Sequence, residues 1–382
     1  MGRKPAFLFD FLVLIAIATA CRDPFEPEVT DADLGILVVE GFIETNGEES
    51  NITLSRTTPI GQAAASRPET GASVRLLSET GDMWLFSETA AGEYKLSETL
   101  DNLKLYELGI SLRDGSKFKS KPMKPIVSPE IEEVGFLRDE FGVEIFLSTQ
   151  GNEEAEYFLW EYKEHWIFFP GVISFLKFEN GKVSTRGEHE RIDRCWTSNI
   201  FPKIILQDAA RFENNTILQR ELVRIPNMSE KLSRRYSIEI TQRALDREAY
   251  DFWEILRKNS DDIGGIFSPL PSIIKSNIIP VEGTSREAIG HIGIGKSSSK
   301  RIYINNADVA PWRVFIPEYE LCIIFPDTIP PSQAPLLFNN NTWVPAREIW
   351  DGPALLGYHA ATRQCTDCTL RGTNKAPDFW EN

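Results

Sequence analysis

Positive charge is scarce in this chain of 382 residues. Lys and Arg number 41 against 56 Asp and Glu, so the formal net charge is −15. Such a chain is a poor candidate for binding nucleic acid through its phosphates, or an anionic membrane surface through a basic patch. We therefore expect no nucleic acid among its partners. Its 42% apolar and 25% charged residues are ordinary for a globular protein, and its length favours two domains or three small ones.

Long apolar runs are absent beyond the amino terminus, so we expect no membrane-spanning helix in the mature chain. The one apolar run, residues 7–17, follows two basic residues and ends in Ala18-Thr19-Ala20-Cys21. A basic start, a short apolar stretch and small residues before a cleavage point indicate a secretory signal peptide. The ending resembles the lipobox of bacterial lipoproteins, which implies that residues 1–20 are removed and Cys21 is lipidated. The alternative is an ordinary signal peptide in which Cys21 has no role.

Residues 21–34 form an acidic segment that Pro24 and Pro27 prevent from becoming helical. A segment of this kind predicts a tether that holds a folded body away from a bilayer. Acidic residues directly after the cysteine also resemble the signal that exports lipoproteins of Bacteroidota to the cell surface. We therefore expect an outer-membrane lipoprotein, anchored by its lipid and facing the cell exterior.

Helical periodicity is absent from residues 35–125, which are predicted to be short strands joined by tight turns. Asn46-Gly47 and Asp114-Gly115 are favoured hairpin turns, and β-branched or alternating runs flank them. Turns recur at a spacing of roughly ten residues, which is typical of an immunoglobulin-like or transthyretin-like β-sandwich. The expected strands are 36–43, 51–55, 72–77, 83–86, 93–96, 106–112 and 117–120.

Residues 126–382 are expected to form a larger β-rich domain after the proline-rich linker at 121–125. The one clear amphipathic helix is Ala244–Lys258, with its apolar residues on one face and Thr241 as its cap. From residue 326 to residue 382 the chain has little periodicity and predicts a loop-like, cysteine-containing tail. Strands are expected at 132–137, 143–147 and 156–162, with hairpins at 180–181 and between 289–294 and 301–304.

Cysteines are few, and after Cys21 the chain has Cys195, Cys322, Cys365 and Cys368. An exported chain with an even number of cysteines favours disulfides, and four cysteines allow three pairings. Cys365 and Cys368 form a C-x-x-C, for which a redox pair and half of a zinc site are the alternatives. A redox pair needs a strand before it and a helix after it, and zinc needs two further ligands. The neighbouring sequence predicts neither arrangement.

Catalytic and cofactor motifs are absent as well. No two of the four histidines stand at a metal-binding spacing, and there is no G-x-S-x-G elbow. Gly290–Gly295 is glycine-rich but is not a dinucleotide-binding fingerprint. We expect it to be a strand whose glycines let another backbone pack closely. The sequence therefore predicts no metal, no cofactor and no catalytic residues.

Aromatic residues, by contrast, are crowded between residues 158 and 169. Alternate positions of a strand share one face, so several of these rings are expected side by side. Core packing is one interpretation, because a sheet face needs such residues. The other is an exposed patch for a protein partner or a sugar ring. The residues of that candidate surface are Trp160, Tyr162, Trp166 and Phe168.

Short motifs along the mature chain resemble a family of Bacteroidota lipoproteins, the domain of unknown function 4249 family. The resemblance implies an outer-membrane lipoprotein, typically encoded near a TonB-dependent receptor. It implies no known reaction and supplies no catalytic residues. The motifs are Leu37-Val38-Val39-Glu40-Gly41, Gly71-Ala72-Ser73-Val74, Gly92-Glu93-Tyr94, Tyr106-Glu107-Leu108, Cys195-Trp196, Ser276-Asn277-Ile278, Cys365-Thr366-Asp367-Cys368 and Gly372–Trp380.

These observations predict a non-catalytic accessory of a TonB-dependent transporter, which captures substrate or caps the barrel. An envelope structural or assembly factor is the second hypothesis, favoured if a flat aromatic patch occurs without a concave pocket. A surface hydrolase that uses acidic residues with His189 or His291 is the third. It is favoured if a pocket gathers a histidine with two carboxylates.

Overall fold

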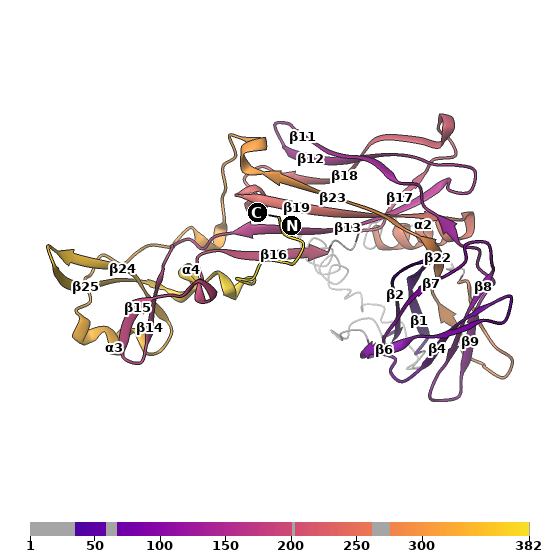
Figure 1. Cartoon of the computed structure of the whole chain (residues 1–382), viewed down its shortest axis with the longest axis horizontal. Helices are drawn as coiled ribbons and strands as arrows, with labels where there is room; N and C mark the ends of the chain where they lie inside the picture. The colour runs from indigo at the N-terminus through magenta and orange to yellow at the C-terminus, as the bar shows by residue number, and fades with distance from the viewer. Residues whose placement is uncertain (1–34, 59–66, 201–202, 262–275, 382) are drawn as a thin grey trace, which may run out of the picture.

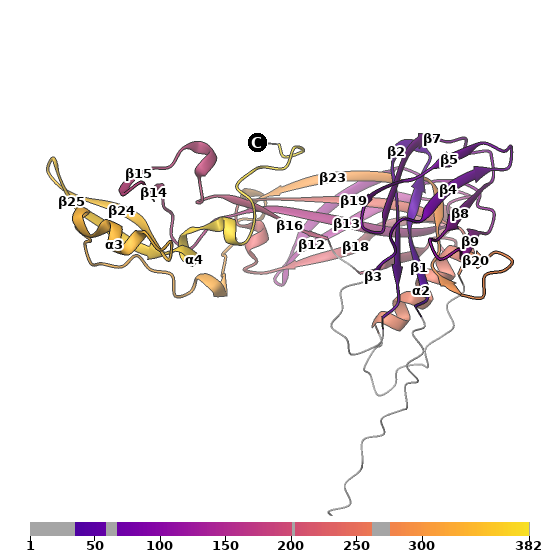
Figure 2. The ribbon, with the colours of Figure 1, turned by 90° about the horizontal axis from the view of Figure 1, so that it is seen from below.

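A computed structural model describes residues 35–58, 67–200, 203–261 and 276–381. Three units follow one another along an elongated molecule: an amino-terminal sandwich, a central sandwich and an arm (Figures 1 and 2). The described chain is mainly β, with a few helices, which confirms the expected fold class. The predicted signal peptide, the tether and Cys21 lie outside the described residues.

The amino-terminal sandwich consists of two sheets whose inner faces share one core of aliphatic and aromatic side chains. Short strands with every second residue buried, such as Ser73–Ser78, explain how both sheets form from this sequence. The first sheet has the order β10 (Ile126–Val127), β22 (Gly293–Lys296), β1 (Leu37–Glu44), β2 (Asn46–Arg56), β7 (Glu93–Thr99) and β6 (Ser87–Ala90), with β21 (Ala288–Ile289) beside β1 and β3 (Arg67–Pro68) beside β2. The second has the order β20 (Ile278–Pro280), β9 (Lys117–Ser120), β8 (Tyr106–Ser111), β4 (Ser73–Ser78) and β5 (Met83–Leu85).

Three strands of this sandwich come from far along the chain, which the sequence did not predict. β20, β21 and β22 lie within the segment expected to belong to the second domain, yet they pair with β9 and β1. The hairpin expected between 289–294 and 301–304 is wrong, because β22 and β23 (Ser298–Asn305) belong to different sheets. The glycines make the parallel pairing possible: a Cβ at Gly290 would lie 2.0 Å from the Val39 carbonyl oxygen. This confirms the expected close approach of a second backbone.

The central sandwich packs a three-stranded sheet against a five-stranded one. Its core is filled mainly from β13 and β19 on one side and β12 and β18 on the other. The smaller sheet has the order β11 (Ile131–Arg138), β12 (Gly142–Gln150) and β18 (Thr216–Pro226). The larger has the order β16 (Cys195–Ile200), β13 (Tyr157–Phe168), β19 (Arg235–Leu245) and β23, with β17 (Ile205–Asp208) also beside β13.

The predicted helix is present as α2 (Arg247–Asp261) and begins three residues later than expected. Thr241 is not its cap, because β19 continues through Thr241 as far as Leu245. Asp246 takes that role, since its carboxylate accepts a hydrogen bond from the Ala249 amide at 2.7 Å. The apolar face of α2 packs on Leu159 and Leu206 of the large sheet.

The arm consists of the hairpin β14 (Leu176–Glu179) and β15 (Lys182–Thr185), the hairpin β24 (Trp343–Asp351) and β25 (Ala354–Thr362), and the helices α3 (Ala334–Phe338) and α4 (Arg363–Thr366). Asn180 and Gly181, at φ of 52° and 77°, make the predicted turn between β14 and β15. The expectation of a loop-like tail is wrong, because β24 and β25 pair across a turn at Gly352. Short 3₁₀ helices complete the described chain: η1 (Glu188–Glu190), η2 (Glu213–Asn215), η3 (Glu230–Leu232), η4 (Asn306–Val309), η5 (Pro317–Tyr319), η6 (Pro331–Gln333) and η7 (Cys368–Leu370).

Candidate functional site: an arginine-lined cavity

The aromatic residues proposed as a surface lie inside the central sandwich. Trp160, Tyr162, Trp166 and Phe168 are all buried, which corrects the surface interpretation and leaves core packing. The physical reason is the cover on one face of β13, where all even positions of this strand of 12 residues lie. That face is covered by the opposite sheet.

Glu164 is the polar exception in this row of aromatic side chains, and it is fully buried. Its carboxylate accepts hydrogen bonds from Lys231 Nζ at 2.7 and 2.8 Å and from the Tyr236 hydroxyl at 2.7 Å. Asn199 donates a further bond at 3.2 Å. Burial, together with the neighbouring carboxylate, raises the pKa of Tyr236 well above its usual value. These contacts stabilise the core, because a buried charge needs partners.

A cavity of about 680 Å³ lies where four strands of the large sheet begin or end. β13 and β23 end there, whereas β16 and β19 begin there, because neighbouring strands run antiparallel. The last residues of the described chain cover one side of it. We call it the arginine cavity. It is lined by Ile167, Phe169, Arg191, Asp193, Arg194, Trp196, Arg234, Arg235, Asn305, Asn306, Ala307, Trp380 and Glu381.

The floor of the arginine cavity is a packed aromatic cluster. Trp380 meets Trp196 edge-on, with 6.4 Å between ring centroids, and meets Tyr303 at 5.9 Å. The Tyr303 hydroxyl donates a hydrogen bond to the Phe379 carbonyl at 2.7 Å, which fixes the chain end. Both tryptophans are more than nine-tenths buried, so the cluster supports the cavity wall.

Four arginines and only two carboxylates line the arginine cavity, so positive charge is in excess there. Arg191 pairs with Asp193 through two bonds, of 2.8 and 2.6 Å. Burial alone would raise the pKa of the Asp193 carboxyl, but the Arg191 guanidinium outweighs it and lowers that pKa. Arg235 lies over the Tyr303 ring at 4.5 Å and 3.7 Å from the exposed Glu381 carboxylate.

Arg194 and Arg234 are both exposed. Within the described ranges neither pairs with a carboxylate. Arg194 lies over the Trp196 ring at 5.1 Å. Their guanidinium groups are therefore available to an anion that enters the cavity.

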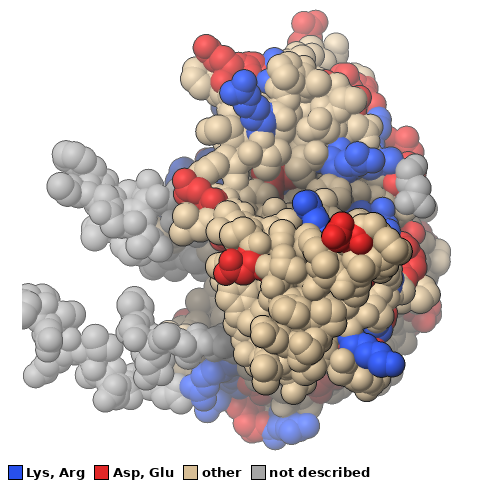
Figure 3. Space-filling view, turned by 90° about the vertical axis from the view of Figure 1, so that its left-hand side faces the viewer, with Lys and Arg blue, Asp and Glu red and all other residues tan. Residues whose placement is uncertain are grey.

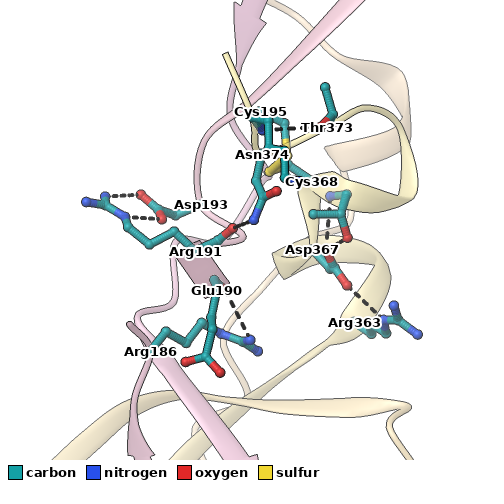
Figure 4. The surroundings of a disulfide bond; sticks show 12 residues. Arg186, Glu190, Arg191, Asp193, Cys195, Arg363, Asp367, Cys368, Thr373 and Asn374 are labelled. Atoms are coloured by element: carbon teal, nitrogen blue, oxygen red, sulfur yellow. Dashed lines mark hydrogen bonds and ion pairs between the residues drawn. A yellow bond between two sulfur atoms is a disulfide. The ribbon is translucent and has the colours of Figure 1, made fainter. Parts of the chain in front are cut away.

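The disulfide Cys195–Cys368 lies beside the segment that carries Arg191 and Asp193 (Figure 4). The Asn374 side chain donates to the Arg191 carbonyl at 2.9 Å, and Thr373 pairs with the Trp196 backbone. These contacts join the end of the chain to the cavity wall.

A second disulfide joins Cys322, which follows η5, to Cys365 of α4 in the arm. The prediction of disulfides is confirmed. The two cysteines of the C-x-x-C, Cys365 and Cys368, bond to distant partners and not to one another. That arrangement contradicts the redox-pair and zinc alternatives.

A smaller pocket of about 230 Å³ lies at the seam between the two sandwiches. This seam pocket gathers His291 with Glu44, Glu49 and Glu161. Each carboxylate has another partner: Ser297 for Glu44, Lys95 for Glu49 and Arg243 for Glu161. Burial lowers the pKa of His291, and its Nδ1 has no hydrogen-bond partner in the described part of the chain. His189 is exposed on η1, away from this pocket's lining.

The arginine cavity was not predicted from the sequence. The features of the sequence that could have indicated it are two pairs of closely spaced arginines in an acidic chain, 191 with 194 and 234 with 235. The motifs Cys195-Trp196 and Gly372–Trp380 also meet here, through Trp196 and Trp380. What the sequence could not supply is the sheet register that brings these segments together.

Within the described ranges, no group of three or more His, Cys, Asp or Glu residues could hold a metal ion. No helix in the part of the chain that the structure describes is long and apolar enough to cross a membrane.

No curated protein matches the sequence. Among solved structures, the chain is similar to a pullulanase complexed with maltotriose from Anoxybacillus sp. LM18-11, with 10% identity and a TM-score of 0.14, covering 53% of this chain and 24% of that one. A chitinase, ChiA74 from Bacillus thuringiensis, gives 11% identity and a TM-score of 0.15 over 45% of this chain and 29% of that one. Likeness at this level carries no argument about fold or function.

A family model matches much more of the sequence. The model described as domain of unknown function DUF4249 matches residues 22–301. The match begins directly after Cys21 and includes both sandwiches up to the first half of β23. The chain therefore belongs to the domain of unknown function 4249 family.

Proposed function

We propose that this protein is an outer-membrane lipoprotein, anchored through Cys21 and facing the cell exterior, that captures a ligand for a TonB-dependent transporter. It acts as a non-catalytic accessory of that transporter. The observation that carries the proposal is the arginine cavity: an open, cation-lined site of about 680 Å³ in a chain of net charge −15. Cavities of this volume are typical of ligand sites.

The cavity favours capture over a purely structural role in the envelope. A flat aromatic patch without a concave pocket would favour the structural hypothesis, and the aromatic row of β13 is buried instead. The cavity wall is held by a disulfide and by the aromatic cluster, so the site needs little ordering when a ligand binds.

The surface of the arm favours the part of the proposal that gives this protein a protein partner. Its end face has large areas without charged side chains (Figure 3). Leu336, Trp350 and Leu356 in the arm are each about half exposed or more. Large exposed apolar side chains are a feature of surfaces that contact another protein. The arm lies at the opposite end of the molecule from β1, the first described strand (Figure 1).

The test is isolation of the lipidated protein from its own membranes in mild detergent, followed by mass spectrometry. We expect a TonB-dependent receptor in stoichiometric amount. Recovery of the lipoprotein alone would contradict the accessory role. A Cys21→Ala variant is the matched control, since it should lose both the lipid and membrane association.

A second candidate function, hydrolysis, is favoured by one observation, the gathering of His291 with three glutamates at the seam pocket. In this hypothesis His291 acts as a base and one of the glutamates of the pocket supplies a proton. Screening oligosaccharide and ester substrates with the native protein and with His291→Asn tests it. Turnover that disappears in the variant would establish the enzyme, whereas no turnover by the native protein would remove the hypothesis.

A further inference from the structure

We propose that the arginine cavity binds a small organic oligoanion, that is, a molecule with two or more carboxylate or phosphate groups on a partly apolar frame. The inference rests on the proposed function and names the class of ligand captured. It concerns the cavity lined by Arg194, Arg234 and Arg235.

The first step is the balance of charge within the cavity. Asp193 is already engaged by Arg191 at 2.6 and 2.8 Å, so this pair adds no net charge. Glu381 lies 3.7 Å from Arg235 but is 73% exposed, so water weakens that ion pair. Arg194 and Arg234 then leave an excess of two positive charges. A ligand with at least two anionic groups would balance them.

The second step is the geometry of the charged groups. A guanidinium presents a planar fork of N–H donors that matches the two oxygens of a carboxylate or the edge of a phosphate. A surface arginine alone would attract any anion weakly. Here exposed arginines stand on separate segments, Arg194 before β16 and Arg234 before β19, around one concavity. This arrangement favours a ligand that reaches several arginines together.

The third step concerns size and apolar surface. A volume of about 680 Å³ is much larger than one inorganic ion needs. Ile167, Phe169 and Ala307 contribute apolar walls between the charged groups. Asn305 and Asn306 add polar groups to the lining. A frame with apolar faces and hydroxyl or amide donors suits such a lining.

The experiment uses the mature, full-length protein and isothermal titration calorimetry. The probes are trigalacturonate, triglutamate and inositol hexakisphosphate, with maltotriose as a neutral comparison and inorganic tripolyphosphate as a simple polyanion. The variant is Arg194→Ala with Arg234→Ala. The matched control is Arg220→Ala with Arg347→Ala, which removes two exposed arginines outside the cavity lining.

We expect at least one organic probe to bind, with an affinity that falls as salt is added. The cavity variant should weaken that binding by about tenfold or more, because each lost charge-assisted bond contributes substantially, and the control should not. The probe that binds best distinguishes a sugar acid, a peptide and a phosphate as sources of the charge. Thermal unfolding of both variants should match that of the native protein, since all four side chains are exposed.

The inference would be overturned by no binding of any anion, by equal binding of maltotriose, or by binding that the cavity variant leaves unchanged. Binding of tripolyphosphate alone would also overturn it, because it would indicate nonspecific attraction of charge. The proposed accessory role is tested separately. If the receptor co-purifies but no anion binds, the ligand class is wrong and the accessory role stands. If anions bind but no receptor is recovered, the transporter partnership is wrong.

Discussion

Glu164 shows how a single residue determines the stability of the central sandwich. It occupies a core-facing position of β13, and its side chain is 1% exposed, against 23% for its partner Lys231. We expect Lys231→Met to lower the free energy of unfolding by about 3–5 kcal/mol, because it leaves a buried carboxylate without its cation. Adding Glu164→Gln to that variant should recover part of the loss. Urea unfolding measures both.

The control for this prediction is Lys182→Met, at an exposed lysine of β15. It should change the stability by no more than about 0.5 kcal/mol. If Lys231→Met lowers the free energy of unfolding no more than this control does, the buried ion pair does not stabilise the fold.

His291 is a second single residue with a predicted effect, because it should make the stability of the folded chain depend on pH. Burial lowers its pKa, and Lys121 lowers it further, whereas Asp246 and Glu248 act in the opposite direction. The unfolded chain therefore binds a proton near pH 6.5 that the folded chain does not. Stability should be unaffected well above that pH and should fall as the pH decreases through it.

His291→Phe should remove part of this acid sensitivity, because the neighbouring seam pocket has room for the ring. His165, whose pKa burial also lowers, should account for another part. Urea midpoints at about pH 5.5 and pH 7.5 measure the effect. An unchanged difference between the two midpoints in the variant would contradict the prediction.

At the scale of elements, the disulfide Cys195–Cys368 joins the start of β16 to η7 across 173 residues. Cys195→Ser with Cys368→Ser should cost about 2–5 kcal/mol, because a long closed loop restricts the unfolded chain. Hydrogen exchange should quicken at residues 191–196 and 368–380, and anion binding should weaken.

The matched control is Cys322→Ser with Cys365→Ser, which opens the shorter loop of the arm. Its hydrogen exchange should quicken within the arm and leave the arginine cavity protected. The prediction fails if the two double variants expose the same segments.

The whole molecule is held together by strands that return to the amino-terminal sandwich. Residues 278–296 supply β20, β21 and β22, and Ile278, Ile292 and Ile294 fill its core. We therefore expect a fragment of residues 35–127 to be unfolded or aggregated, because its sheets would have open edges and its core would lack these side chains. Circular dichroism and NMR spectra of the fragment test this, with the full chain as control. A dispersed spectrum and a cooperative melt would contradict it.

Local patterns predicted much of the strand structure. The expected strand 72–77 corresponds to β4, the Asn180-Gly181 turn predicted the β14–β15 hairpin, and the glycine-rich stretch 290–295 predicted the close approach of another backbone. These succeeded because a turn or an alternating strand is specified by residues close in sequence. The β24–β25 hairpin was missed, although Asp351-Gly352 is a turn signal.

The interpretation of the aromatic residues between 158 and 169 shows where local pattern fails. Periodicity indicated one shared face, yet which face is covered depends on β12 and β18, which approach from elsewhere in the chain. Likewise, nothing near Arg194 indicates that Arg234 will line the same cavity.

By itself, the sequence determined the net charge, the mainly-β class, the positions of the strands up to about residue 162 and several turns, and the use of cysteines for disulfides, because these depend on composition or on neighbouring residues. The tertiary structure alone decided which cysteines pair, which strands complete the first sandwich, and which arginines line a common cavity. Those properties depend on contacts between distant segments, such as Cys195 and Cys368, 173 residues apart, and Glu44 and Ser297, 253 residues apart. Such contacts follow from sheet register and packing, which no short stretch of sequence specifies.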